Sequence, residues 1–185
     1  MFLSLKNKII LLSMLFLSIV VVPSPTQSLY NLPELTVNTL KKIDVKQVAC
    51  MARNIYYEAG AEAMPGQAAV ARVVMNRVNH GFAETPCKVI YQKTVINENI
   101  VCQFSWVCEG KDDPNKSNVR YKQALKVAYE VMVYDMYKNV VPKTALFFHA
   151  NTIDPLWPYK QVARIGNHIF YSKQKVNNEQ KSGKK

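Results

Sequence analysis

The sequence contains few of the residues from which metal centres are usually built. It has three histidines and four cysteines, and neither a C-x-x-C nor an H-E-x-x-H pattern occurs. Zinc sites are commonly built from such pairs, so we expect no metal and no cofactor. A G-x-S-x-G pattern is also absent, which removes the usual serine-hydrolase arrangement. An amidase that recruits zinc through His80, His149 and His168 remains as the metal-dependent alternative.

The N-terminus has the pattern of an export signal. It reads MFLSLKNKIILLSMLFLSIVVV, in which Lys6 and Lys8 precede an apolar run from Ile9 to Val22. This run is typical of a signal peptide and falls short of the roughly 20 residues that span a bilayer. Residues 1–28 are therefore predicted to be a signal peptide, with an uncleaved anchor as the alternative. We expect an exported protein of the periplasm or cell envelope, with no stable membrane span after cleavage.

The cysteines agree with export to an oxidising compartment. Cys50, Cys87, Cys102 and Cys108 form an even set, which indicates disulfides and argues against a cysteine nucleophile. Four cysteines allow three pairings, and sequence alone leaves the choice open. The short loop between Cys102 and Cys108 favours that pair, which leaves Cys50 with Cys87.

The chain is basic, with a formal net charge of +11. Two of these charges lie in the leader, and five lysines less one glutamate in SKQKVNNEQKSGKK supply four more. Residues 173–185 are therefore predicted to be a basic, disordered tail. The remaining excess is modest and no basic-aromatic module is present, so nucleic acid is not an expected partner.

Helical patterns dominate the first half of the chain. The prolines near Pro33 indicate a linker over residues 29–44, and Asp44 is placed to cap a helix over residues 45–60. Pro65 opens a second helix that Gly81 closes, and PCKVIYQ suggests a short third one.

The second half of the chain mixes patterns. Residues 94–118 are expected to be irregular, with a turn at DDPNKSN. A long amphipathic helix follows, with a predicted core stripe of Tyr121, Leu125, Ala128, Met132 and Met136. TALFFHA and QVARIGNHIFYS then have the composition of strands. The chain is predicted to be α+β, mainly helical with a small antiparallel sheet, with one domain over residues 45–172.

The stretch NIYYEAGAEAMPGQ contains the best candidate for chemistry. Glu58 ends the predicted helix, one turn after the apolar Ile55. Burial beside apolar groups disfavours a carboxylate and raises its pKa, so such a glutamate can donate a proton near neutral pH. A surface glutamate beside the bend is the alternative. That alternative is the expectation for Glu62, which lies between Gly60 and Pro65.

Aromatic residues occur in predicted loops, where their faces can stack on sugar rings. CQFSWVCEG places Phe104 and Trp106 between two cysteines, and DPLWP contains Trp157. Gln103 and Asn76 could bond sugar hydroxyls and N-acetyl groups. The alternative is that each aromatic ring packs in the core, where aromatic residues contribute most to stability.

Several of these segments together resemble a known family. MARNIYYEAGAE, GQAAVARVVMNRV, CKVIYQ, CQFSW, ALFFHA, PLW and ARIGNHIFY are similar to the SleB-type cell-wall hydrolases, or spore-cortex-lytic enzymes, over about residues 46–172. The resemblance implies a lysozyme-like, lytic-transglycosylase-like fold that cleaves the glycan strands of peptidoglycan. It places the first glutamate of an E-A-R-G-E motif, here Glu58, as the acid. Gly60 and Ala61 depart from the arginine and glycine of that motif.

The loops and the resemblance define the candidate substrate-binding residues: Tyr57, Glu62, Asn76, Gln103, Phe104, Trp106, His149, Trp157 and Tyr171. In a lytic transglycosylase, Glu58 would protonate the MurNAc–GlcNAc glycosidic oxygen while the 6-hydroxyl of MurNAc closes a 1,6-anhydro ring. Glu62 would be the second carboxylate of a true hydrolase. The alternatives are an N-acetylmuramoyl-L-alanine amidase and a non-catalytic envelope-binding module.

Overall fold

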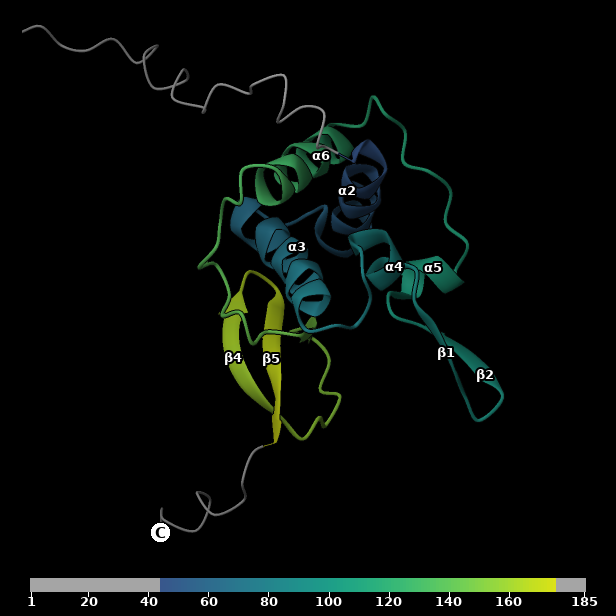
Figure 1. Ribbon diagram of the computed structural model, residues 1–185, viewed down its shortest axis with the longest axis vertical. Helices are drawn as coiled ribbons and strands as arrows, with labels where there is room; N and C mark the ends of the chain where they lie inside the picture. Colours follow the sequence, from purple (N-terminus) through teal and green to yellow (C-terminus); the bar gives the residue numbers. More distant parts are fainter. Residues whose placement is uncertain (1–43, 176–185) are drawn as a thin grey trace, which may run out of the picture. The chain divides into compact units, whose positions relative to one another are not determined.

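A computed structural model describes residues 44–175 of the chain. The predicted signal peptide, almost all of the linker and residues 176–185 lie outside the described residues. None of the helices between residues 44 and 175 is both long and apolar enough to cross a membrane. The described part consists of a helical half and a small sheet (Figure 1).

Two helices form the centre of the helical half. Helix α2 (Val45–Ala59) begins at Asp44, whose side chain accepts hydrogen bonds from the next turn, as predicted. Helix α3 (Met64–Asn79) has Pro65 in its first turn, and the chain turns away at Gly81, where φ is 75°. Most of α3 is buried all round because it packs against helices on one side and the sheet on the other (Figure 1).

Helix α6 (Val119–Met132) packs on α2 and α3 with a face that matches the predicted stripe only in part, since Ala128 is buried and Tyr121 and Met132 pack against the core. Its buried residues are Ala124, Val127, Ala128 and Val131, whereas Leu125 is 41% exposed. Small side chains on this face allow the helices to approach closely. The prediction that the helix continues to Met136 was also wrong, since α6 ends at Met132 and Asp135 has a positive φ.

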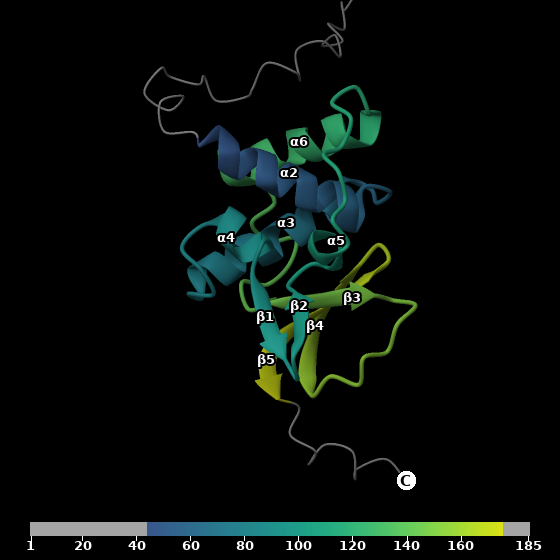
Figure 2. The ribbon, with the colours of Figure 1, turned by 90° about the vertical axis from the view of Figure 1, so that its right-hand side faces the viewer.

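The segment predicted to be irregular contains regular structure. After α4 (Pro86–Ile90), strands β1 (Lys93–Ile96) and β2 (Asn99–Cys102) form a hairpin, followed by the single turn α5 (Ser105–Cys108). The hairpin extends away from the helices (Figure 2). Its two-residue turn needs positive φ at both Asn97 and Glu98. Glutamate is not a usual residue at such a position, so this turn could not be recognised from the sequence.

The second sheet is antiparallel, with the order β3-β5-β4. Its strands are β3 (Phe147–Ala150), β4 (Tyr159–Ile165) and β5 (His168–Lys175), so the two predicted strand segments are confirmed. Strand β5 includes residues 173–175, which were predicted to belong to the disordered tail. Phe170 of β5 packs on Ala69 and Val73 of α3, and this second apolar cluster joins the sheet to the helices.

Two disulfides link the elements, with the pairing that the short loop favoured. Cys50 of α2 bonds to Cys87 of α4, and Cys102 of β2 bonds to Cys108 of α5. The main core lies between α2, α3, α4, α5 and α6. The second disulfide therefore holds α5, and with it the segment from 103 to 108, at the edge of this core.

Candidate active site

Glu58 lies in the last turn of α2, between two hollows of the surface. The first, which we name the corner hollow, has a volume of about 340 Å³ and is lined by residues 56–62 and Arg120. The second, the sheet hollow, has a volume of about 330 Å³. Its lining comes from α2, α5, the loop after α5, and strands β3 and β5: Tyr57, Glu58, Ser105, Trp106, Glu109, Lys111, Phe148, His149, Ala150, Ile153 and His168. Tyr57 and Glu58 line both hollows.

The environment of Glu58 favours its protonated form. Burial raises the pKa of Glu58 from the ordinary 4.5 to about 7. The positive charge of Arg77 opposes this shift, and the negative charge of Glu109 adds to it. A carboxyl group with this pKa is present in both protonation states near neutral pH, so it can donate a proton and take one back.

Arg77 interacts electrostatically with Glu58, and the sequence analysis did not assign it to the site. Its guanidinium is buried, its Nε donates to the carbonyl oxygen of Leu146 at 2.7 Å, and it lies over the rings of Phe104 and Phe147. Burial lowers the pKa of Arg77 to about 10, so it remains charged at neutral pH. With its amide oxygen turned toward Arg77, Gln103 accepts from Nη1 at 3.0 Å. Gln103 therefore orients Arg77, and its contact with sugar stays a prediction.

Trp106 and Phe104 are core residues, and the prediction that they form a sugar-stacking loop was wrong. Trp106 is only 2% exposed, and its Nε1 donates to Oδ1 of the buried Asn54 at 3.1 Å. Tyr57 stacks on Trp106 with ring centroids 5.0 Å apart. Trp106 thus supports Tyr57 from behind, and Tyr57 presents a side chain to both hollows. Phe104 is equally buried and packs on Arg77.

Asn76 is also structural. It is buried, and its Nδ2 donates to the carbonyl oxygens of Pro142 at 3.1 Å and Ala145 at 3.0 Å. These bonds fix the chain that leads into β3. The partners of Asn76 and Arg77 lie about seventy residues away, so they could not be inferred from the sequence.

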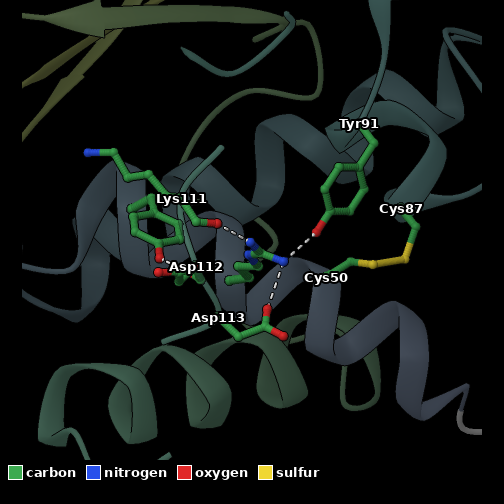
Figure 3. A network of polar contacts seen from close by, with 8 residues as sticks. Cys50, Cys87, Tyr91, Lys111, Asp112 and Asp113 are labelled. Carbon is green, nitrogen blue, oxygen red and sulfur yellow. Dashed lines mark hydrogen bonds and ion pairs between the residues drawn. A yellow bond between two sulfur atoms is a disulfide. The ribbon is translucent and has the colours of Figure 1, made fainter. Parts of the chain in front are cut away.

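The loop after α5 is tied to α2 by a polar network (Figure 3). Nη1 of Arg53 pairs with Asp113 at 2.7 Å and donates to the hydroxyl of Tyr91 at 3.4 Å, and its Nη2 donates to the carbonyl oxygen of Lys111. The hydroxyl of Tyr57 donates to the carbonyl oxygen of Asp112. These contacts hold the Lys111–Asp113 segment beside the sheet hollow, so they also set the position of Lys111 in its wall.

His149 and Tyr171 form a pair on the sheet, and His149 lines the sheet hollow. Nδ1 of His149 lies 2.8 Å from the carbonyl oxygen of Ala150, so it carries the hydrogen in the neutral ring. Nε2 then accepts from the hydroxyl of Tyr171 at 2.9 Å. Trp157 packs edge-on against both rings and is 37% exposed. The structure therefore brings together three predicted site residues that are distant in sequence.

The histidines do not form a metal site. Nδ1 of His80 bonds to the carbonyl oxygen of Asn76 at 2.8 Å, away from the sheet hollow. Between residues 44 and 175, no group of three or more His, Cys, Asp or Glu side chains is arranged to hold a metal ion. The zinc amidase alternative thus has no ligand set within the described residues.

Glu62 is not the surface residue that its sequence context suggested. Its side chain is only 10% exposed, and its Oε1 accepts from the backbone N–H of Asn167, in the turn between β4 and β5, at 3.2 Å. Nδ1 of His168 lies 3.8 Å from the same oxygen. His168, a buried residue of the sheet hollow, was not among the predicted site residues.

Gly60 has a close backbone neighbour. A Cβ atom at this position would overlap the carbonyl oxygen of Tyr56, so a side chain here would require the backbone to shift. Gly60 itself lines the corner hollow and presents no side chain to it. The one arginine among the residues that line this hollow is Arg120, which comes from the first turn of α6.

The fold and the site define a lysozyme-like α+β domain with a protonatable glutamate in an open, two-sided cleft. The cell wall hydrolase family matches residues 61–171, and the chain belongs to this family. The match begins just after Glu58.

Two solved structures from Bacillus are similar to the chain. One is the catalytic domain of the germination-specific lytic transglycosylase SleB from Bacillus anthracis, with 24% identity and a TM-score of 0.50, covering 76% of this chain and 100% of that chain. The other is the catalytic domain of the Bacillus cereus SleB protein, with 24% identity and a TM-score of 0.48, covering 77% of this chain and 97% of that chain. The comparison with curated proteins gave no match.

Proposed function

We propose that the protein is a peptidoglycan-degrading enzyme that cleaves the MurNAc–GlcNAc bond as a lytic transglycosylase, with Glu58 as general acid and base. The observation that carries this proposal is the position of Glu58, whose pKa is raised to about 7 and which faces a hollow on either side. A glycan strand that runs through both hollows would place a glycosidic oxygen at this carboxyl group. Membership of the cell wall hydrolase family supports the choice of substrate.

The proposed reaction needs a single protein carboxyl group. Protonated Glu58 donates its proton to the glycosidic oxygen as the bond to C1 of MurNAc breaks. The 6-hydroxyl of the same sugar then attacks C1, and the Glu58 carboxylate takes the proton that this hydroxyl loses. The products are a 1,6-anhydro-MurNAc end and a free GlcNAc hydroxyl, and Glu58 returns to its starting state.

The other carboxylates of the two hollows are engaged in contacts of their own. A hydrolase needs a second carboxylate that acts as nucleophile or activates a water molecule. Glu62 is held by Asn167, and Glu109 pairs with Lys111 at 3.0 Å. Contact with Lys111 and Ser105 holds the pKa of the exposed Glu109 below its ordinary value, so Glu109 is ionised and cannot replace Glu58 as the proton donor.

The proposed site of action is the cell envelope. Two disulfides join Cys50 to Cys87 and Cys102 to Cys108, which agrees with an oxidising compartment. Export by the N-terminal segment remains a prediction from the sequence. The proposed partners are the glycan strands of peptidoglycan, bound along the two hollows by Tyr57 and His149 and, next to His149, by Trp157 and Tyr171.

Digestion of purified sacculi, with mass analysis of the products, tests this function. We expect 1,6-anhydro-MurNAc ends from the wild type and a loss of about 10²- to 10⁴-fold in rate for Glu58→Gln, the typical contribution of a general acid. Glu109→Gln, which changes an exposed carboxylate of the same hollow, is the matched control and should retain most activity. Reducing muramic acid ends would identify a hydrolase, and free lactoyl ends with released peptide an amidase. Binding without any product would identify a non-catalytic module.

A further inference from the structure

Glu62 connects two parts of the molecule that are far apart in sequence. Its backbone belongs to the corner between α2 and α3, where its N–H donates to the carbonyl oxygen of Ala59 at 2.9 Å. Its own carbonyl oxygen accepts from the buried side chain of Gln67 at 3.1 Å. Its carboxylate, by contrast, accepts from the backbone N–H of Asn167 in the β4–β5 turn. Glu62 is therefore held through both its backbone and its side chain.

Two glycines make room for this side chain. A Cβ atom at position 66 would lie 2.9 Å from Cβ of Glu62, and a Cβ atom at position 166 would overlap its Oε2 oxygen. Gly166 also has a φ of 56°, which glycine adopts at no steric cost. The β4–β5 turn thus approaches the Glu62 carboxylate very closely. Any side chain at position 166 would displace either the turn or the carboxylate.

The contact of Glu62 with the turn extends to His168. Nδ1 of His168 lies 3.8 Å from Oε1 of Glu62 and has no hydrogen-bond partner within residues 44–175. The imidazole packs edge-on against Phe148, with ring centroids 5.3 Å apart, and both residues line the sheet hollow beside Glu58. The position of this wall relative to the end of α2 therefore depends on what holds the turn at Asn167.

We propose that Glu62 is a positioning residue, whose carboxylate clamps the β4–β5 turn to the α2–α3 corner and so fixes the wall formed by His168 and Phe148 relative to Glu58. The consequence for activity rests on the proposed function, whereas the clamp itself does not. Glu62 acts through the turn and takes no part in proton transfer. A carboxamide at this position, which still offers an oxygen to the N–H of Asn167, keeps most of the clamp.

The clamp can be measured without activity, by amide hydrogen exchange and NMR. In Glu62→Ala, exchange at Asn167 should become faster by about tenfold or more, because the amide loses a hydrogen bond to a charged acceptor. The amide of Leu146, which bonds to the carbonyl oxygen of Tyr171 in the same sheet, is the internal control and should change little. In Glu62→Gln, the pKa of His168 should fall, because the charge of Glu62 raises it against the effect of burial and of His149. Unchanged exchange at Asn167 would refute the clamp.

Kinetics at a temperature where each variant is fully folded separate positioning from catalysis. Glu62→Gln should retain kcat within about tenfold of wild type with an unchanged pH profile, while Glu62→Ala should lose more. A loss of about 10²- to 10⁴-fold in Glu62→Gln would make Glu62 a proton-transfer group and overturn the proposal. If Glu58→Gln were fully active, the proposed function would fail, but exchange at Asn167 would still decide the clamp.

A double-mutant cycle tests the contact from the other side. Gly166→Ala should lower activity in the wild type by more than Gly81→Ala, since Gly81 also has a positive φ but has no neighbour within 4 Å of an added Cβ atom. In the Glu62→Ala background, the difference in activity loss between Gly166→Ala and Gly81→Ala should be smaller, because the clashing carboxylate is gone. Additive effects in this cycle would contradict the proposal.

Discussion

At the scale of single residues, two opposing effects set the pKa of Glu58. Burial at the end of α2 raises its pKa, and the buried guanidinium of Arg77 limits the rise to about 7. Without Arg77 the carboxyl group would hold its proton too tightly to act as a base. With full solvation it would ionise near pH 4.5 and would not act as an acid. Burial together with the positive charge of Arg77 therefore suits a group that must both donate and accept a proton near neutral pH.

The raised pKa of Glu58 should also make stability depend on pH. Between pH 4.5 and pH 7 the folded chain binds more protons at Glu58 than the unfolded chain, so the free energy of unfolding falls as pH rises through this range. Glu58→Gln removes this dependence. The variant should gain up to about 3 kcal/mol relative to wild type between pH 4 and pH 8, at 1.36 kcal/mol per pKa unit.

Urea denaturation of both proteins at several pH values measures this difference. Glu84→Gln is a suitable control, since Glu84 is exposed and its pKa is shifted in the opposite direction by Lys88. A constant difference between wild type and Glu58→Gln across the range would mean that Glu58 has an ordinary pKa. The rate of glycan cleavage by wild type should fall through the same midpoint as pH rises above about 7.

At the scale of secondary structure, the elements that could be predicted are those with local signals. The start of α2 at Asp44 and the end of α3 near Gly81 follow from capping and glycine rules. The β1–β2 hairpin lacked such a signal, because Glu98 occupies a turn position that glycine usually takes. The buried face of α6 was predicted only in part. Apolar residues lie on adjacent stripes of this helix, and its packing on α2 and α3 buries Val127 and Val131 rather than Leu125.

The two disulfides join elements over very different chain lengths, and their contributions to stability should differ accordingly. Cys50 and Cys87 are 37 residues apart, whereas Cys102 and Cys108 are 6 apart. Loop-closure entropy then predicts a loss of about 4 kcal/mol for Cys50→Ser with Cys87→Ser, and about 2 kcal/mol for Cys102→Ser with Cys108→Ser. Thermal unfolding of the two double variants tests the order. A larger loss for the second pair would show that the short disulfide acts mainly through native packing of α5.

At the scale of the whole molecule, the cleft is assembled from segments that are remote in the sequence. Glu58 comes from the end of α2, His149 from β3, His168 from β5 and Lys111 from the loop after α5. The candidate acid could be proposed from its local context, because its place one turn after Ile55, at the end of an apolar helical stripe, is visible in the sequence. The partners of Asn76 and the clamp at Glu62 could not, because they depend on how the sheet packs against α3.

The same global packing separates the two tryptophans, which the sequence placed in similar loops. Trp106 lies in the core and bonds to Asn54, whereas Trp157 is partly exposed on the sheet next to His149. Trp106→Ala should lower the free energy of unfolding by about 3–5 kcal/mol, the usual cost of removing a large buried aromatic side chain. Urea denaturation of Trp106→Ala and of the wild type measures this loss.

Trp157→Ala should behave in the opposite way. Its ring contacts His149 and Tyr171 at the edge of the sheet hollow, and part of its surface is free to contact a sugar. We expect a smaller fall in Tm than for Trp106→Ala and a rise in KM of about 2- to 10-fold on glycan strands, in line with the energy of a single aromatic contact.

Leu156→Ala is the matched control, because Leu156 is the adjacent residue and is 85% exposed. Equal effects of Leu156→Ala and Trp157→Ala on KM would show that the loop, and not the indole ring, contacts the glycan. An unchanged KM in both variants would confine glycan binding to the two hollows.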